Sequence, residues 1–519
     1  MQRRALLHRL GRQAAALALL RLFGPAAAQP APWPAGTGHP FTLGVASGMP
    51  RPDSVVIWTR LAPRPHDADG GLPPLPLAVR WELAEDERFS VGVRRGEFVA
   101  RPERAHAVHV EVTGLASART YFYRFIAGGA VSEMGRTRTA PAEDAAVARL
   151  RLALASCQHY EQGFYAAHRE IAERELDFVL FVGDYIYESS NPNHQVRTHE
   201  GPVPQTLPAY RARHATYKLD ADLRAAHAAH PWILTWDDHE VENDYAGDAS
   251  PSGLDAVAFL RRRAIAYQAY FEHLPVSPAM APQGPAMRIH DRYRWGRLAE
   301  LWTMDGRQYR SVQACGKDGA AGGRVITGCE VLADPARSVF GTAQERWLAE
   351  GLAASTRAWK LVAQGSQVSS SGITTPGLGR RVYSDGWDGY PRARERLLDA
   401  IATAGGNTLV LGGDVHRHVA AQLRQRPEDP RSAVVAAEFV CSSISSRGLS
   451  ETLMAAIRAS NPDLVHARSE ERGYALVDLT PQVAHCDFRA TPYPVRADAT
   501  LHSQARFVAE AGRPGVARD

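Results

Sequence analysis

The sequence lacks several patterns that mark whole classes of protein. It has no basic tract with interleaved aromatic residues, which disfavours nucleic-acid binding. It has no Gly-x-Ser-x-Gly motif and no Walker-type loop, so serine-hydrolase and P-loop chemistry gain no support. After the N-terminal segment no apolar run reaches membrane-spanning length, and we expect no permanent membrane anchor. The net charge of +4 over 519 residues points to no particular partner.

Lysine and cysteine are both scarce. Lys218, Lys317 and Lys360 are the only lysines, and a coding bias toward arginine explains this more simply than a phosphate-binding role. Of the five cysteines, Cys315 and Cys329 flank a glycine-rich stretch and can close a small loop. Such a bridge would contribute roughly 3 kcal/mol in the chain-entropy model. Cys441 and Cys486 lie in apolar sequence and are predicted to be buried thiols. Cys157, at a predicted strand end, is then the one unpaired cysteine that calls for a functional explanation.

Residues 1–28 resemble an export signal. Arg3 and Arg4 form a twin arginine before a modestly apolar stretch, and Ala26-Ala27-Ala28 offers a cleavage site. Arg21 interrupts the apolar stretch, which suits a weakly hydrophobic twin-arginine signal better than an ordinary secretion signal. An amphipathic helix is the alternative. We therefore expect a periplasmic or secreted protein with the twin-arginine machinery as its export partner.

Two patterns divide the rest of the chain. Residues 41–140 contain short alternating strands without intervening helices, which predicts an all-β sandwich of the immunoglobulin or fibronectin type. Residues 149–490 alternate strands with helical stretches, which predicts a layered α/β domain. Helices are expected near 164–175, 344–355 and 391–403. Residues 491–519 are expected to form a C-terminal tail.

In the second region, four short apolar runs end in residues that can bind metals. Such runs are typical of buried strands, and ligands bind beyond the carboxyl ends of strands in open α/β sheets. The four runs end at Cys157, at Asp184 with Tyr187, at Asp237 with Asp238, and at Asp414 with His416. Together they predict one polynuclear metal site built from distant segments.

The residue types suggest which metals bind. Asp184 can bridge two cations. Tyr187 needs a strongly acidic cation to lose its proton, and with the thiol of Cys157 it points to Fe(3+).

A second position is richer in oxygen. Asp414 and His416 can reach neighbouring metals, and Asp238 adds a hard oxygen ligand. Asp237 and Asn243 can serve the same position or a further ion. Oxygen ligands favour Ca, Mg or Mn.

Two further residues are candidates for catalysis. His239 is placed to act as a general acid or a phosphate donor. Arg307 can contact a substrate phosphate, although a surface or supporting role suits it equally well. Paired cations are the clamp that phosphatases and nucleases use.

Each motif taken alone has a structural alternative. The Asp-Asp-His-Glu segment can be a helix start with capping carboxylates. A lone Gly-Asp-x-x-Tyr is usually a turn, and Asp414 with His416 can be a satisfied loop pair. The occurrence of all four at predicted strand ends favours the metal site.

The motifs resemble those of the PhoD-like alkaline phosphatase and phosphodiesterase family. The matching segments run in order from residue 41 to residue 490: Phe41–Gly48, Asp53–Arg60, Ala155–Gln158, Gly183–Glu188, Trp236–Asp244, Asp305–Arg310, Asp385–Pro391 and Gly413–His416. The resemblance implies a metallophosphoesterase-like α/β sandwich core behind the β-sandwich domain, and twin-arginine export.

By position, the resemblance also implies a ligand set. The ferric site would take Cys157, Asp184, Tyr187 and His416. The Ca(2+) site would take Asp184, Asp238 and Asp414, with Asp237 and Asn243 at a further ion. His239 matches the histidine of the metallophosphoesterase Asn-His-Glu motif.

The sequence therefore predicts an exported, metal-dependent hydrolase of small-molecule, lipid or polymer phosphoesters that uses a metal-activated water. A phospholipase D-like phosphodiesterase is one alternative. A non-catalytic exported binding protein with structural metals is another.

Overall fold

The computed structural model describes residues 32–192 and 195–519. The predicted signal segment, residues 1–28, lies outside the described residues. Within those residues, no helix combines the length and the apolarity that a bilayer crossing requires.

A ten-stranded sheet carries the first three of the four predicted strand ends. Its strands lie in the order β25 (Arg513–Arg518), β24 (His502–Glu510), β23 (Val483–Pro492), β22 (Glu471–Leu479), β9 (Leu150–Ala155), β10 (Phe178–Val182), β11 (Pro231–Thr235), β1 (Val45–Gly48), β2 (Ser54–Arg60) and β5 (Ala107–Thr113). The central strands β9, β10 and β11 are parallel and almost entirely buried, as the continuous apolar runs predict. Their carboxyl ends therefore meet at one edge.

A seven-stranded sheet carries the fourth predicted strand end, which precedes Asp414. Its order is β12 (Asp291–Trp295), β13 (Ala299–Thr303), β15 (Trp359–Ala363), β18 (Asn407–Gly412), β20 (Val434–Val440), β19 (His418–Arg424) and β21 (Leu464–Arg468). Strands β13, β15, β18 and β20 are parallel.

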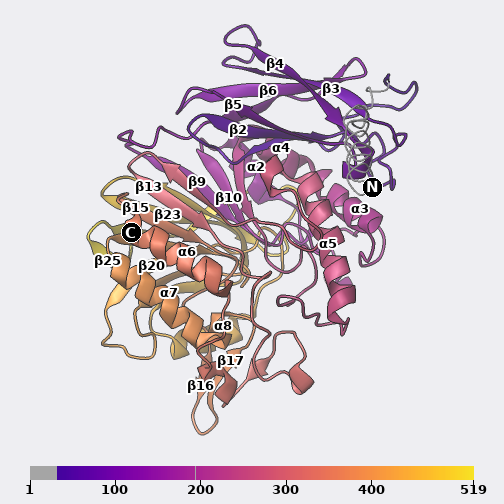
Figure 1. The fold of residues 1–519 in the computed structure, drawn as a ribbon. Helices are drawn as coiled ribbons and strands as arrows, with labels where there is room; N and C mark the ends of the chain where they lie inside the picture. Colours follow the sequence, from indigo (N-terminus) through magenta and orange to yellow (C-terminus); the bar gives the residue numbers. More distant parts are fainter. Residues whose placement is uncertain (1–31, 193–194) are drawn as a thin grey trace, which may run out of the picture.

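The two sheets face each other across one core, with helices outside. Leu361 and Leu409 belong to the same apolar cluster as Leu154 and Phe181 of the other sheet. Val362, the neighbour of Leu361, packs instead with Leu397 among helical side chains. The helices are α2 (Ala166–Glu173), α3 (Leu207–Lys218), α4 (Ala221–Ala229), α5 (Ala256–His273), α6 (Gly341–Ala354), α7 (Pro391–Ala404) and α8 (Glu451–Ser460). Figure 1 shows α6 and α7 in front of the seven-stranded sheet. The predicted mixture of helices and sheets is present, and α2, α6 and α7 lie where the three helices were expected.

The N-terminal region has two β layers, one of which belongs to a sheet that it shares with the rest of the protein. Its upper layer contains β4 (Arg94–Ala100), β3 (Leu77–Ala84), β6 (Thr120–Ala127), β7 (Ala130–Val131) and β8 (Gly135–Arg138). This layer packs over β2 and β5 through a separate apolar cluster. Strands β1, β2 and β5 are nevertheless part of the ten-stranded sheet, because β1 pairs with β11 in parallel.

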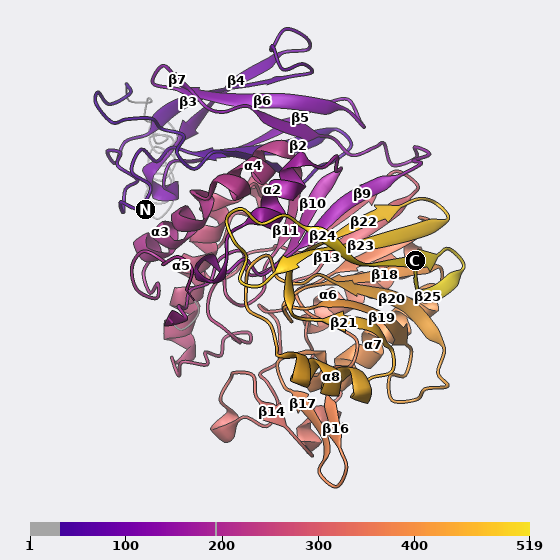
Figure 2. The same ribbon diagram turned by 180° about the vertical axis from the view of Figure 1, so that it is seen from behind.

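The C-terminal segment differs from the expectation. Residues 491–519 were predicted to form a tail, yet they contain β24 and β25, which extend the ten-stranded sheet beyond β23. Figure 2 shows these strands in yellow beside β22 and β23. The alternating burial of β24 explains its place in the sheet.

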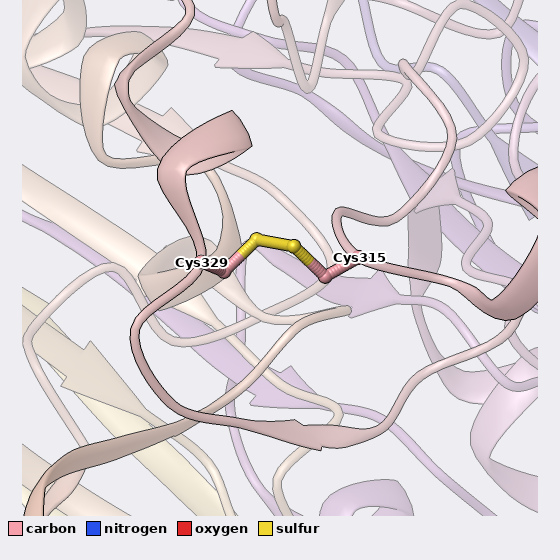
Figure 3. Close-up of a disulfide and its surroundings, with 2 residues drawn as sticks. All are labelled: Cys315 and Cys329. Carbon is pink, nitrogen blue, oxygen red and sulfur yellow. A yellow bond between two sulfur atoms is a disulfide. The ribbon is translucent and has the colours of Figure 1, made fainter.

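A small sheet stands apart from the two large ones. It pairs β14 (Val325–Ile326), β17 (Gly379–Tyr383) and β16 (Ile373–Thr375), below α8 in Figure 2. The loop that carries β14 is closed by a disulfide between Cys315 and Cys329, whose Cα atoms lie 6.2 Å apart (Figure 3). Cys157, Cys441 and Cys486 are buried and free.

Candidate metal centre

The chain turns sharply where β9, β10 and β18 end. Cys157, Asp184 and Asp414 have positive φ angles of 59°, 58° and 64°. Such conformations are costly for residues other than glycine, and they cluster at functional sites. At Gly183, a Cβ atom would lie 2.5 Å from the backbone nitrogen of Asp237. The strand ends therefore approach so closely that only glycine fits before Asp184.

Four predicted ligands converge in what we call the Cys157 cluster: Cys157, Asp184, Tyr187 and His416. The Tyr187 hydroxyl donates to Asp184 Oδ2 at 2.9 Å and lies 3.1 Å from His416 Nε2. The Sγ atom of Cys157 and ligand atoms of Asp184 and His416 lie within 4.8 Å of one another. Segments more than 200 residues apart thus bring sulfur, carboxylate, phenol and imidazole donors to one point.

Burial disfavours the charged forms of the side chains in this cluster. Cys157 and Asp184 are each 1% exposed and Tyr187 is 3% exposed. Burial, followed by the charge of Asp184, raises the pKa values of Cys157 and Tyr187 well above their usual range. Burial likewise raises the pKa of Asp184. The Oδ1 atom of Asp184 has no hydrogen-bond partner among the described residues. This donor set and its unused oxygen fit a cation such as Fe(3+), which would hold the donors in their deprotonated forms.

A second group, the Arg307 cluster, consists of Arg307, Asp237, Asp238 and Asp385. The Arg307 side chain is fully buried; its Nε donates to Asp237 Oδ1 and its NH1 lies 2.9 Å from Asp385 Oδ2. Its NH2 lies 3.4 Å from Asp238 Oδ2. Burial alone would raise the pKa of Asp238, but Arg307 and His239 outweigh it and lower the pKa. The geometry places Arg307 between carboxylates, so it holds them in position and does not face open space.

Asp414 lies near both clusters. Its Oδ2 accepts a hydrogen bond of 2.7 Å from Ser366, which follows β15. Burial and the charges of Asp237 and Asp238 raise its pKa to about 8. An oxygen donor at this position fits a hard cation between the clusters.

His239 stands between the clusters and a cavity of about 400 Å³. Its Nδ1 lies 2.7 Å from Glu188 Oε2, and its ring contacts Tyr187 in a tilted arrangement with the ring centroids 4.0 Å apart. Burial would lower its pKa, but the charges of Glu188, Asp184 and Asp238 raise it well above the usual value. A protonated imidazole beside a cavity is suited to donating a proton.

The structure does not bring Asn243 to the site. Its side chain is exposed, and its backbone N–H donates to Glu188 Oε1 at 3.0 Å. The next residue, Asp244, takes the expected place, because its carboxylate gathers with those of Asp238 and Asp385 within 4.8 Å. The turn after β11 shifts the inward position by one residue. The other predicted site residues all lie in or beside the two clusters.

Sequence reasoning also missed Glu188, Asp385 and Ser446 as site residues. Glu188 and Asp385 lie inside motifs that already marked the family, so their signal was present. Ser446 follows β20, and its hydroxyl oxygen lies 2.9 Å from the Tyr187 hydroxyl and 2.8 Å from the Cys157 carbonyl, either of which can accept its one hydrogen. No motif marked it.

Comparisons with family models, a curated protein and a solved structure all match one family over most of the chain. The family model for the PhoD-like phosphatase matches residues 152–488, and the model for the N-terminal domain of PhoD-like phosphatases matches residues 26–141. The chain is 42% identical over 491 residues to alkaline phosphatase D of Bacillus subtilis (strain 168), covering 92% of this chain and 82% of that protein. A solved structure described as PhoD is similar with a TM-score of 0.88 at 40% identity, covering 94% of this chain and 93% of that one.

Proposed function

The chain belongs to the PhoD-like phosphatase family and is a phosphoester hydrolase; on that premise we propose that it is metal-dependent and cleaves phosphomonoesters and phosphodiesters at alkaline pH. The main support is the Cys157 cluster, where four donors converge and Asp184 Oδ1 lacks a partner. A non-catalytic binding protein is set aside by the likeness to a protein named alkaline phosphatase D.

The residues divide between the proposed ions by their chemistry. Cys157, Asp184, Tyr187 and His416 would hold Fe(3+), and Asp184, Asp238 and Asp414 would hold Ca(2+). Asp237 stays a candidate for a further ion, and Asp244 replaces Asn243 there because its carboxylate faces Asp238. When bound, such a pair of cations supplies a hydroxide from water and neutralises charge on the phosphoryl oxygens.

The chain's own residues perform the remaining tasks. His239 donates a proton to the leaving oxygen, and Glu188 fixes the ring through Nδ1. Arg307 is a positioning residue that holds Asp237 and Asp238 at the proposed calcium position. Ser446 orients the phenol oxygen of Tyr187.

The proposal is tested with metal analysis and an Asp184→Asn variant assayed on p-nitrophenyl phosphate and its bis-ester. We expect about a thousandfold loss of kcat, in line with the loss of a group that stabilises the transition state. Asp399→Asn is the matched control, since Asp399 is an exposed partner of Arg426 far along the chain. Activity of Asp184→Asn within tenfold of the wild type would contradict the mechanism.

The ferric assignment has its own test. A phenolate bound to Fe(3+) absorbs visible light, so Tyr187→Phe should remove a charge-transfer band that the wild type shows. An iron-loaded Tyr187→Phe protein with an unchanged band would assign the absorption to another ligand.

A phospholipase D-like activity is the second candidate within the same reaction class. Side-by-side kinetics on a monoester, a diester and a phospholipid decide between the two. A kcat/KM for the phospholipid well above that for both soluble esters would favour the second.

We also propose export by the twin-arginine route to the periplasm or beyond. The support is the twin arginine at Arg3 and Arg4 together with the Cys315–Cys329 disulfide, since disulfides persist in oxidising compartments. Replacing both arginines with lysine should leave the protein in the cytoplasm on cell fractionation.

A further inference from the structure

A second cavity, of about 480 Å³, opens beside His416 and Asp414. We call it the apolar groove. Its apolar lining includes Val325, Ile373, Val382, Trp387, Leu453 and Ile457. Its volume is within the usual range for a small-molecule site, roughly 300–1,000 Å³. Because two residues of the metal centre form part of its wall, the groove leads directly to the reacting position.

The cavity beside His239 has a different character. It is lined largely by polar side chains, among them His159, Ser190 and His239. The two cavities share His416, Arg447 and Gly448. A ligand at the metal centre therefore has a polar space on one side and an apolar one on the other.

Exposed apolar side chains gather at the apolar groove. Val325 is 67% exposed, Leu453 38% and Leu449 37%. Large apolar residues gathered at a cavity mouth mark a binding site more often than scattered ones do. Val325 belongs to β14, Leu453 to the first turn of α8, and Leu449 to the segment just before that helix.

The charges in the groove select the kind of ligand. Its basic lining residues are Arg381, Arg417 and Arg447, of which Arg417 is buried, and Asp414, a proposed metal ligand, is the one carboxylate among the described lining residues. Basic residues beside an apolar wall suit an anion that carries an apolar group.

The wall of the groove is tied to the metal centre. Val325 pairs with Tyr383 in the small sheet, and its loop is closed by the Cys315–Cys329 disulfide (Figure 3). The Tyr383 hydroxyl and the Gly323 N–H both donate to Asp244 Oδ2, at 2.8 and 2.9 Å. The wall of the groove is thus joined by hydrogen bonds to Asp244, beside the proposed metal centre.

We propose that the apolar groove binds an alkyl or aryl ester arm of a phosphodiester whose phosphate lies at the metal centre, a proposal that rests on the proposed function. An apolar arm gains free energy by leaving water, whereas a hydrated polyol or polyether arm gains little there. We therefore expect kcat/KM to increase with the apolarity of one ester arm.

The test uses p-nitrophenyl esters of methyl, butyl and octyl phosphate and of a triethylene glycol monoether phosphate. We expect kcat/KM to rise about two- to fourfold for each methylene between methyl and butyl. The polyether ester should stay near the methyl ester despite its length. Equal kcat/KM for the methyl, butyl and octyl esters would overturn the groove assignment while leaving the proposed function intact.

A variant locates the effect in the groove. Leu453 is the third residue of α8, and Ser450 caps this helix, so Leu453→Glu places glutamate at a position that favours the helix. The octyl-to-methyl ratio of kcat/KM should fall at least tenfold. Leu75→Glu is the matched control, because Leu75 is 48% exposed and lies in the N-terminal region.

Three other outcomes would count against the proposal. If Leu453→Glu keeps the wild-type ratio, or if the gain appears only above the concentration at which the octyl ester forms micelles, the apolar arm binds elsewhere. If the wild type hydrolyses none of the esters, including the methyl ester, the proposed function fails first and the groove assignment with it.

Discussion

The Cys157 cluster and the Arg307 cluster lie side by side, yet they handle buried acidic groups in opposite ways. In the Arg307 cluster, a fully buried guanidinium pairs with three carboxylates, and Arg310 adds a second contact to Asp385 at 2.8 Å. In the Cys157 cluster, the side-chain hydrogen bonds within residues 32–192 and 195–519 involve no guanidinium or ammonium group, and His416 Nδ1 bonds to the backbone carbonyl of Arg447. The Arg307 cluster contains its own guanidinium counter-charge, whereas the Cys157 cluster contains none and has only the neighbouring imidazole of His239 beside Asp184.

The difference suggests separate roles for the two clusters: the Arg307 cluster supports the structure, and the Cys157 cluster is the proposed cation-binding site. A buried carboxylate without a counter-charge is costly, and it either takes up a proton or binds a cation. The Arg307 cluster is already compensated and can hold its shape alone. The Cys157 cluster needs a cation to become charged, so metal loss should act mainly there.

The strongest test removes the metals. Treatment with a chelator should abolish hydrolysis, because the Cys157 cluster then returns to its protonated form, while the far-ultraviolet circular dichroism stays unchanged. Adding back both Fe(3+) and Ca(2+) should restore activity, and either ion alone should not. Full activity in protein shown by mass spectrometry to be free of metal would remove the basis of the comparison.

The next largest effect should come from Arg307→Met. Three buried carboxylates would lose their common partner, and breaking such a network costs about 3–5 kcal/mol. Urea unfolding at pH 8 measures the change in the free energy of unfolding. A loss below about 1 kcal/mol would show that the cations, and not Arg307, compensate this cluster.

Lys218 extends the comparison to a buried basic side chain outside the two clusters. Its Nζ has no hydrogen-bond partner among the described residues and lies 4.3 Å from the centroid of the Trp58 ring. Burial lowers its pKa to about 7. Because the unfolded value is near 10.4, charging this lysine costs the folded state, and stability should rise as pH increases from about 7 to about 10.4.

Lys218→Met checks this sign. The variant's free energy of unfolding, relative to the wild type, should fall by up to about 4 kcal/mol between pH 7 and pH 10.5, as measured by urea unfolding at both values. A pH-independent difference would mean that Lys218 stays charged through its contact with Trp58.

The smallest effect should follow Ser446→Ala. The lost hydrogen bond to Tyr187 should cost about 1 kcal/mol in unfolding and should shift the visible band of the iron-loaded protein. Thr as a second replacement should restore the band. An unchanged band in Ser446→Ala would remove Ser446 from the metal centre.

The sequence allowed the strand ends to be predicted because each buried strand is a continuous apolar run whose end is visible. It did not identify Asp244 in place of Asn243, since the two are neighbours and only the backbone turn decides which side chain points inward. Ser446 could not be identified from the sequence, because no local pattern links it to Tyr187, 259 residues away. The shared sheet was missed for the same reason, as the four residues Val45–Gly48 give no hint that their partner strand is β11.

The pairing of β1 with β11 has a consequence for any attempt to divide the protein. Cutting the chain between residues 141 and 149 would not yield two independent parts, because removing the first would leave β11 as an unpaired edge at the middle of the molecule. Exposed, apolar edges of this kind recruit other chains. A shortened protein that begins near residue 149 should therefore aggregate. The N-terminal strands cover the edge of β11 and so prevent it from pairing with other chains.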